Sequence, residues 1–161
     1  EPYRRQRQMC IRDRSATDRC NMVKLAIKPF DYMSLSTIET DRPGNTYTAD
    51  TLAQIYDSYK KIYFIIGADS LLYIQDWYHP EYICSHCHLL CANRDNNSAS
   101  VLIDQKHFLA DKYGAVIDFI DVPKLPYSST DIRKKVAMGL SVKEDVGEEV
   151  EEYIKSRKLY V

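Results

Sequence analysis

The sequence has 161 residues, enough for one domain that buries a hydrophobic core. Its 22 Lys and Arg residues almost balance its 23 Asp and Glu residues, which argues against a basic nucleic-acid-binding surface and against an acidic tail. No apolar run approaches the ~20 residues that span a bilayer, and the first thirty residues hold no apolar signal segment, so neither a membrane partner nor secretion is expected.

The number and spacing of the cysteines indicate the redox state of the cellular compartment. There are five, at Cys10, Cys20, Cys84, Cys87 and Cys91. An odd number at uneven spacing differs from the paired pattern of a secreted disulfide framework. We therefore expect a reducing, cytoplasmic location.

The first fourteen residues are rich in arginine and have little apolar pattern. We interpret residues 1–14 as a non-native leader, and a basic arm that binds RNA or lipid is the alternative. The predicted domain covers residues 15–161.

Patterns typical of helices and strands begin at Ser15. Ser15 suits a helix N-cap, and apolar residues at helical spacing follow until Lys28-Pro29 ends the pattern. Residues 33–39 alternate apolar and polar side chains, which predicts a half-buried strand. After a loop over 40–46, apolar spacing predicts a helix over 48–59.

The middle of the chain contains a continuous apolar run. Residues 62–66 end at Gly67, and such a run is typical of a strand buried on both faces of a parallel sheet. The acidic stretch 144–152 is interpreted as a solvated helix face. The other predicted elements are helices over 69–73, 80–84, 99–113, 129–139 and 144–156 and strands over 89–92 and 115–120.

This alternation predicts an α/β fold, Rossmann-like and doubly wound, in which a parallel sheet carries helices on both faces. Ligands of such folds bind outside the carboxyl ends of the strands. The residues that follow Ile66, Ala92 and Ile120 are therefore the first candidates for a site.

Hydroxyl and guanidinium side chains surround one predicted helix start. Ser128 and Thr130 lie in its first turn, and Arg133 follows one turn later. Backbone N–H groups and the helix dipole favour an anion there, and an arginine can make a forked contact with a phosphate. The same residues also fit a plain N-cap with a surface arginine, and the spacing does not decide between these interpretations.

Two further groups follow the apolar strand. Gly67 would allow close approach of a ligand, and Asp69 could accept a hydrogen bond from a ribose hydroxyl; the alternative is a tight turn with Asp69 as N-cap. Trp77, beside Tyr78 in a polar stretch, offers a flat face for stacking on a planar ring, and core packing is the alternative.

Three cysteines and two histidines between Cys84 and Cys91 suggest a zinc site. We assign no metal, because Cys91 falls in a predicted buried strand and Cys87 falls at a helix end. No second Cys/His pair stands at a finger-like distance.

These segments occur in the order and spacing of a known family. Residues 45–52, Asn-Thr-Tyr-Thr-Ala-Asp-Thr-Leu, are similar to the Ser-Tyr-Thr-x-Asp-Thr segment of bacterial nicotinate-nucleotide adenylyltransferases. Four further matches complete the resemblance, which runs from about Ser15 to Val161. The first two are 64–70 with Trp77-Tyr78, and Ala92-Asn93-Arg94 with Asp95 in place of a usual proline. The others are Ser128-x-Thr130-x-x-Arg133, the signature of the nucleotidyltransferase superfamily, and 149–154 with Leu159-Tyr160, which resemble the final helix and tail of the family.

The resemblance implies adenylyl transfer from ATP, accompanied by Mg²⁺, to nicotinate mononucleotide in NAD biosynthesis. It implies that Thr48 and Tyr78 present backbone N–H groups to the nicotinate carboxylate and that Trp77 stacks on the pyridine ring. Tyr47, Gly67 and Asp69 would complete the substrate site. Ser128, Thr130, Arg133 and Arg94 would bind ATP. The implied partners are ATP and nicotinate mononucleotide, with self-association left open.

The sequence departs from the family in one respect. The family opens with a strand, a Gly-Gly-Thr-Phe-Asp-Pro loop and a His-x-Gly-His motif, none of which is in this sequence. We therefore expect an N-terminally truncated member with no catalytic histidines, little or no activity, low stability and exposed apolar edges at Ile65 and Ile117. The alternatives are an adenylyltransferase for nicotinamide mononucleotide or pantetheine phosphate, and a non-catalytic nucleotide-binding module.

Overall fold

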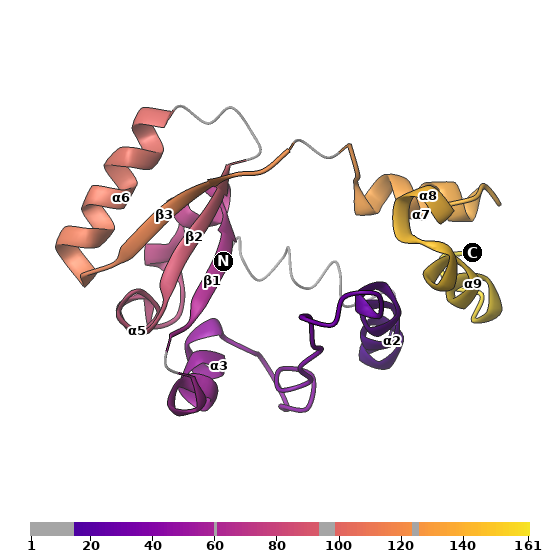
Figure 1. Ribbon diagram of the computed structural model, residues 1–161, viewed down its shortest axis with the longest axis horizontal. Helices are drawn as coiled ribbons and strands as arrows, with labels where there is room; N and C mark the ends of the chain where they lie inside the picture. Colours follow the sequence, from indigo (N-terminus) through magenta and orange to yellow (C-terminus); the bar gives the residue numbers. More distant parts are fainter. Residues whose placement is uncertain (1–14, 60, 94–98, 124–125) are drawn as a thin grey trace. The chain divides into compact units, whose positions relative to one another are not determined.

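The computed structural model describes residues 15–59, 61–93, 99–123 and 126–161, so the segment interpreted as a leader lies outside the described part. The chain forms two compact units, coloured along the sequence in Figure 1. Unit 1 includes the described residues 15–41 and 126–161, and unit 2 includes those between 42 and 123.

Unit 2 is built on a three-stranded parallel sheet (Figure 1). The order is β1 (Tyr63–Gly67), β2 (His88–Asn93), β3 (Val116–Asp121). Gly67 lies opposite Ala92, which lies opposite Ile120. Because the strands are parallel and in this register, their carboxyl ends lie along one edge of the sheet.

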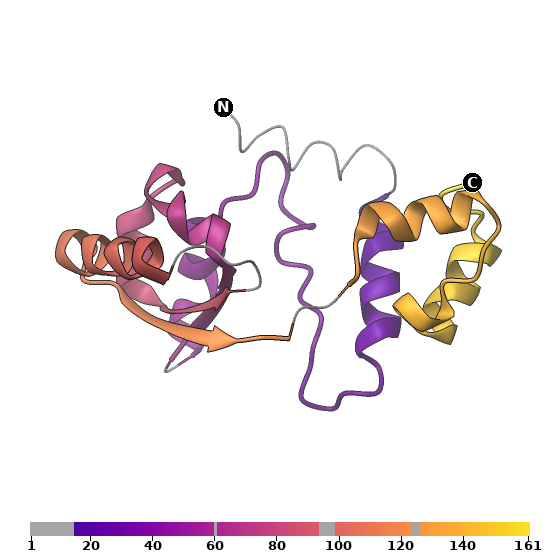
Figure 2. The ribbon, with the colours of Figure 1, turned by 90° about the horizontal axis from the view of Figure 1, so that it is seen from above.

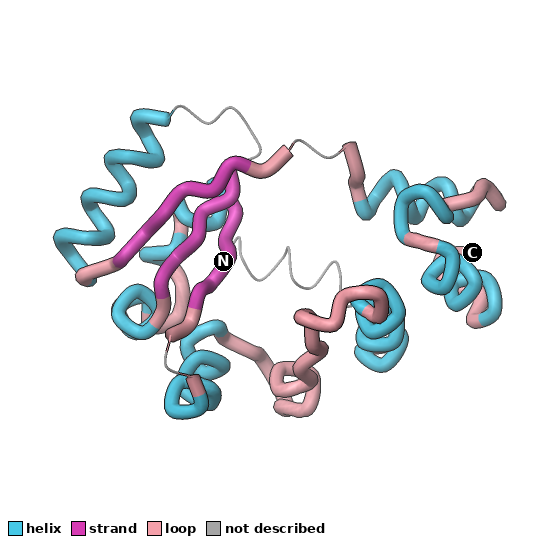
Figure 3. Tube along the Cα trace, viewed as in Figure 1, coloured by secondary structure: helices cyan, strands magenta, loops and turns pink. Residues whose placement is uncertain are grey.

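Helices cover one face of this sheet. Those of unit 2 are α3 (Thr48–Ile55), α4 (Ala68–Leu72), α5 (Pro80–His86) and α6 (Ala99–Tyr113), with short 3₁₀ turns η1 (Tyr56–Ser58) and η2 (Ile74–Asp76). The helices α4, α5 and α6 contact the strands, and Figures 2 and 3 show them on the same side of the sheet. The predicted α/β alternation with a parallel sheet is confirmed, whereas the helices of unit 2 cover one face of the sheet and not both faces as predicted.

Burial alternates along the strands as this one-sided cover requires. Leu89 and Ile117 face the helices and are buried, whereas Tyr63 and Ile65 lie on the other face and are exposed. The prediction that residues 62–66 are buried on both faces is therefore wrong. The expected exposed edge is confirmed for Ile65, which is 66% exposed, and wrong for Ile117, which is 1% exposed on the covered face.

The predicted strand over residues 33–39 is wrong. These residues adopt turns and irregular backbone. A strand needs a neighbour to accept its hydrogen bonds, and among the described residues the only ladders join β1 to β2 and β2 to β3. Local bonds form instead, because the Thr37 hydroxyl donates to the Asp41 carboxylate at 2.7 Å and the Thr40 hydroxyl donates to the Thr37 carbonyl at 2.9 Å.

Unit 1 is a small helical assembly. Its helices are α2 (Ala16–Ile27), α7 (Ser129–Ala137), α8 (Lys143–Val146) and α9 (Glu148–Ser156). Val150, Ile154 and Leu159 form its buried core, against which Met22 and Val136 pack. The single helix predicted over 144–156 is wrong, because Gly147 at φ 86° separates α8 from α9.

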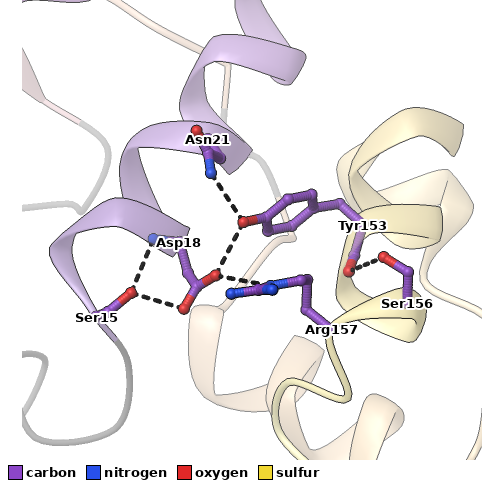
Figure 4. Close-up of polar contacts among 6 residues, drawn as sticks. All are labelled: Ser15, Asp18, Asn21, Tyr153, Ser156 and Arg157. Atoms are coloured by element: carbon purple, nitrogen blue, oxygen red, sulfur yellow. Dashed lines mark hydrogen bonds and ion pairs between the residues drawn. The ribbon is translucent and has the colours of Figure 1, made fainter.

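A buried carboxylate joins α2 to α9 (Figure 4). Asp18 accepts hydrogen bonds from the Ser15 hydroxyl at 2.7 Å and the Tyr153 hydroxyl at 2.8 Å, and Arg157 lies 3.4 Å away. Ser15 also accepts from the Asp18 backbone N–H at 3.0 Å, which confirms it as the N-cap of α2. The Ser15 and Tyr153 hydrogen bonds, followed by the Arg157 charge, hold the pKa of Asp18 below its ordinary value.

The interpretation of residues 144–152 as a solvated face is wrong for Glu151, which is 7% exposed. One carboxylate oxygen accepts from the Ser141 hydroxyl and the Val142 N–H, both at 2.7 Å, and the other lies 2.9 Å from the Lys155 ammonium. These hydrogen bonds, that of Ser141 first, lower the pKa of Glu151 from 4.5 to about 2. Glu151 thus fastens the turn after α7 to α9.

No helix among the described residues combines the length and apolar character that crossing a bilayer requires.

We expect Glu151→Gln to lower the stability of unit 1 at neutral pH. The folded pKa lies below the unfolded one, so the contribution of this carboxylate is present above about pH 4.5 and is lost as the pH falls towards 2. Urea unfolding at pH 7 should give a lower free energy of unfolding for the variant than for the wild type. This difference should disappear as the pH falls from about 4.5 to 2. Glu152→Gln, at the exposed neighbouring carboxylate, is the matched control, and equal behaviour of the two variants would contradict the assignment.

Candidate functional site

The carboxyl end of β1 passes directly into α4. Gly67 is the N-cap of α4 at φ −76° and ψ 156°, so the alternative in which Asp69 is the N-cap is wrong. Asp69 lies in the first turn and is exposed, where its charge is favourable at the positive end of the helix. A Cβ atom at Gly67 would meet no atom within 4 Å. Neither the backbone angles nor the neighbouring atoms therefore require glycine here.

Two predicted substrate residues from distant segments lie together. The rings of Tyr47 and Tyr78 are 4.5 Å apart between centroids and tilted by 33°. Tyr47 is the N-cap of α3 and makes no side-chain cap bond, and Thr48 is the first helical residue. The first-turn N–H groups of a helix have no intrahelical acceptor, so this contact places an amide-rich helix start beside Tyr78.

Trp77 follows the η2 turn and is half-buried. Its indole packs against the core of unit 2, edge-on to Phe64 at 6.3 Å and 72°. Its backbone N–H donates to the carbonyl of the fully buried Ile74 at 3.0 Å. Part of the ring therefore packs in the core, as the alternative interpretation of Trp77 predicted. Because the side chain is only half-buried, the rest of the ring is accessible.

His79 was not singled out from the sequence. It has a left-handed backbone at φ 50° and ψ 59° immediately before Pro80, a conformation that is costly for a residue other than glycine. Its Nδ1 lies 2.9 Å from a Glu81 oxygen, and this hydrogen bond is the main cause that lowers the pKa of Glu81. Its ring meets Tyr78 edge-on at 4.1 Å. Strained residues of this kind concentrate at ligand sites.

An open groove of about 560 Å³ runs between α3, α5 and the end of α6. This volume lies in the range of small-molecule sites. Its lining includes Asp50, His79, Glu81, Tyr82, Lys112 and Tyr113. In the sequence, His79 directly follows Tyr78, and Asp50 lies two residues after Thr48.

The predicted ATP residues Ser128, Thr130 and Arg133 begin α7 in unit 1. Ser128 is the N-cap, and its hydroxyl accepts from the Asp131 N–H at 3.5 Å, as the N-cap interpretation requires. The Arg133 guanidinium donates to the Thr130 hydroxyl at 3.4 Å, so these two side chains lie together on the first turn. Arg94 lies outside the described residues.

The cysteine cluster belongs to the core. Cys84, Cys87 and Cys91 are buried free thiols, and the Cys87 thiol donates to the Ile83 carbonyl at 3.0 Å. Burial raises the pKa of Cys84 to about 11 and that of Cys87 to about 12. Over the described ranges, no group of three or more His, Cys, Asp or Glu side chains is arranged to hold a metal ion.

We expect these three thiols to resist alkylation in the folded protein, because they are buried and neutral. The measurement is labelling by a thiol reagent at pH 8 in a Cys10→Ser, Cys20→Ser background, with and without denaturant. Labelling should require denaturation. Rapid labelling of the folded chain, or stoichiometric zinc in the purified protein, would contradict the core assignment.

Comparison with known proteins gives consistent matches. A family model described as cytidylyltransferase-like matches residues 14–135. The probable nicotinate-nucleotide adenylyltransferase of Lachnoclostridium phytofermentans is 35% identical over 145 residues, which cover 89% of this chain and 72% of the relative. The probable enzyme of the same name from Caldicellulosiruptor bescii is 36% identical over 145 residues, covering 90% of this chain and 74% of the relative.

Solved structures show the same fold. Plasmodium falciparum nicotinic acid mononucleotide adenylyltransferase complexed with APC matches with a TM-score of 0.68 at 19% identity, covering 91% of this chain and 76% of that one. The Plasmodium falciparum protein complexed with NaAD matches with the same TM-score and identity, covering 92% and 77%. The predicted Rossmann-like class is thereby confirmed.

Proposed function

The chain belongs to the nicotinate-nucleotide adenylyltransferase family, and from that premise we propose that it binds ATP and nicotinate mononucleotide for adenylyl transfer. The products are nicotinate adenine dinucleotide and pyrophosphate. The observation that carries the proposal is the contact of Tyr47 with Tyr78, because it joins the start of α3 to the Trp77-Tyr78 pair.

The reaction requires alignment and charge stabilisation rather than a protein nucleophile. A phosphate oxygen of the mononucleotide attacks the α-phosphorus of ATP. The new P–O bond forms as the bond to the β-phosphate oxygen breaks, and pyrophosphate leaves with the electron pair. The phosphates of ATP are oxygen ligands of the kind that Mg²⁺ prefers, so the ion would accompany ATP as its complex and would neutralise charge on the phosphates.

The mononucleotide is assigned to unit 2. The N–H groups of Thr48 and Tyr78 bind the nicotinate carboxylate, and the accessible part of Trp77 stacks on the pyridine ring. Tyr47 supports this pair through its ring contact. The space beside Gly67 lets the ligand approach the β1 end, where Asp69 accepts from a ribose hydroxyl.

The ATP phosphates are assigned to the start of α7, where Ser128, Thr130 and Arg133 supply donors at the positive end of a helix. Arg133 already lies against Thr130 and can turn its guanidinium to a phosphate. Arg94 is assigned to ATP on resemblance alone. The reaction is placed in the cytoplasm, where the buried thiols stay reduced.

These 161 residues contain no His-x-Gly-His motif. In the family, those histidines stabilise charge at the transferred group. We therefore propose that these 161 residues bind both substrates with little or no turnover.

The first test is ligand choice. Calorimetric titration should show binding of nicotinate mononucleotide, weaker binding of nicotinamide mononucleotide and none of pantetheine phosphate, because a carboxylate accepts from N–H groups more strongly than an amide does. Incubation with MgATP and nicotinate mononucleotide should then give nicotinate adenine dinucleotide slowly. Preference for the amide or for pantetheine phosphate would transfer the assignment to another adenylyltransferase. A chain that binds nucleotide yet forms no dinucleotide after a Gly-Gly-Thr-Phe-Asp-Pro loop and a His-x-Gly-His motif are added would support a non-catalytic module.

The second test separates the two substrates. Trp77→Ala should raise the Kd of nicotinate mononucleotide about tenfold and leave that of ATP unchanged. Arg133→Ala should raise the Kd of ATP by about 10- to 100-fold through loss of a charge-assisted bond, and leave the mononucleotide unchanged. Lys134→Ala, at the exposed neighbour of Arg133, is the control for lost charge. If Lys134→Ala and Arg133→Ala weaken the binding of ATP equally, Arg133 contributes through its charge alone and makes no specific contact with the phosphates.

A further inference from the structure

Gln105, in the middle of α6, forms hydrogen bonds to the chain segment 71–75, which leads to Trp77. Its side-chain amide is half-buried and donates twice, to the Leu71 carbonyl at 3.1 Å and to the Gln75 side-chain oxygen at 2.7 Å. Gln75 in turn donates to the Leu72 carbonyl at 2.9 Å. Two side chains therefore satisfy the last two carbonyls of α4.

These carbonyls need such partners. The last four carbonyls of a helix lack α-helical donors, and α4 has only five residues. The Tyr73 N–H caps its end by donating to the Ser70 and Leu71 carbonyls, and the side chains of Gln105 and Gln75 add the remaining bonds to Leu71 and Leu72. The chain then turns through η2, where the Asp76 N–H donates to the Tyr73 carbonyl and the Trp77 N–H to the Ile74 carbonyl, both at 3.0 Å. Any shift of the α4 end is carried through this short turn to the indole.

The hydrogen bonds of Gln105 also connect segments that are far apart in the sequence. The hydrogen bond from Gln105 to Leu71 spans 34 residues, and the one to Gln75 spans 30, so Gln105 ties two distant segments at a single amide. Phe64 meets the indole edge-on, and the Trp77 backbone is bonded to the η2 turn through the Ile74 carbonyl, so the position of the Trp77 backbone follows that of the turn.

We infer that Gln105 is a positioning residue for the planar ring of the substrate, because it acts on Trp77 through Gln75 and the η2 turn. The inference rests on the proposed function for the ligand, while the positioning of Trp77 stands on the hydrogen bonds alone. Gln105 touches no substrate. It keeps the indole at the orientation in which a pyridine ring can stack on it.

The variant Gln105→Met keeps the length of the side chain and removes both donors. Trp77 is the only tryptophan, so its fluorescence, excited at 295 nm, reports on this part of the chain. We expect faster acrylamide quenching of Trp77 in Gln105→Met with an unchanged far-ultraviolet circular dichroism spectrum. The Kd of nicotinate mononucleotide should rise about 3- to 10-fold, as loss of a neutral hydrogen bond predicts, and that of ATP should stay unchanged.

Two further variants complete the test. Gln54→Met makes the same chemical change at an exposed position of α3 and should match the wild type in both measurements. Gln75→Met removes the hydrogen bond that Gln105 and Gln75 share and also the bond of Gln75 to the Leu72 carbonyl. The loss of affinity in the double variant should therefore be smaller than the sum of the two single losses, because both single variants lose the shared bond. Gln75→Met also serves if Gln105→Met does not fold.

Each result decides a separate point. Equal quenching in the wild type and Gln105→Met overturns the inference, as does an equal loss of affinity for ATP and mononucleotide. A wild-type chain that binds no mononucleotide defeats the proposed function, and the quenching comparison then still decides whether Gln105 positions Trp77.

Discussion

Unit 2 depends on the burial of one face of its parallel sheet beneath α4, α5 and α6. Leu71, Ile83, Leu89 and Leu109 are fully buried there, and Ile117 is 1% exposed. Each such side chain contributes about 1.5–3 kcal/mol when it leaves water. This packing fixes the helices against the strands. The segments that connect them, including the η2 turn and the residues before α5, therefore occupy defined positions at the ends of packed elements.

Unit 1 uses a different balance, because its core is small. Its buried cluster of Val150, Ile154 and Leu159, together with the buried Val142, is supplemented by two buried carboxylates. A buried charge is costly unless its oxygens are hydrogen-bonded, and both Asp18 and Glu151 have several partners. Such partners are directional, so they set the angle at which helices meet. The orientation of the start of α7 follows from polar contacts at its far end as well as from apolar packing.

Local patterns predicted the elements that are stabilised locally. The bounds of α6 agree with its apolar spacing, and the three strands agree within one or two residues, because runs such as Ile-Tyr-Phe-Ile-Ile are decisive within a few positions. The predicted strand over 33–39 failed since a strand is defined by its neighbour. Glu151 was misjudged for a similar reason, as its partner Ser141 lies ten residues away.

The candidate site shows the same division. Ser128 could be predicted as a helix cap from its type and position, and Trp77 as a stacking face from its polar surroundings. The resemblance supplied Thr48 and the role of Tyr78. Neither source indicated that Tyr47 contacts Tyr78, that His79 is left-handed, or that Gln105 reaches Leu71. The two contacts join segments about 30 residues apart, so no spacing rule within one segment contains them. The backbone of His79 is a local feature that residue type alone does not indicate, because a left-handed conformation is uncommon for histidine.

In the proposed function, this arrangement also accounts for a choice of acid over amide. A carboxylate presents only acceptors, whereas a carboxamide must turn an NH₂ group towards one of the donors it meets. Two backbone N–H groups, at Thr48 and Tyr78, would pair with both oxygens of the acid and clash with the amide. Discrimination of this kind requires donors that cannot move away. In that proposal, the Tyr47–Tyr78 ring contact would keep one donor near the other, and the hydrogen bonds of Gln105 would keep the indole beside them. Rigid packing of unit 2 would then produce the selectivity for the acid.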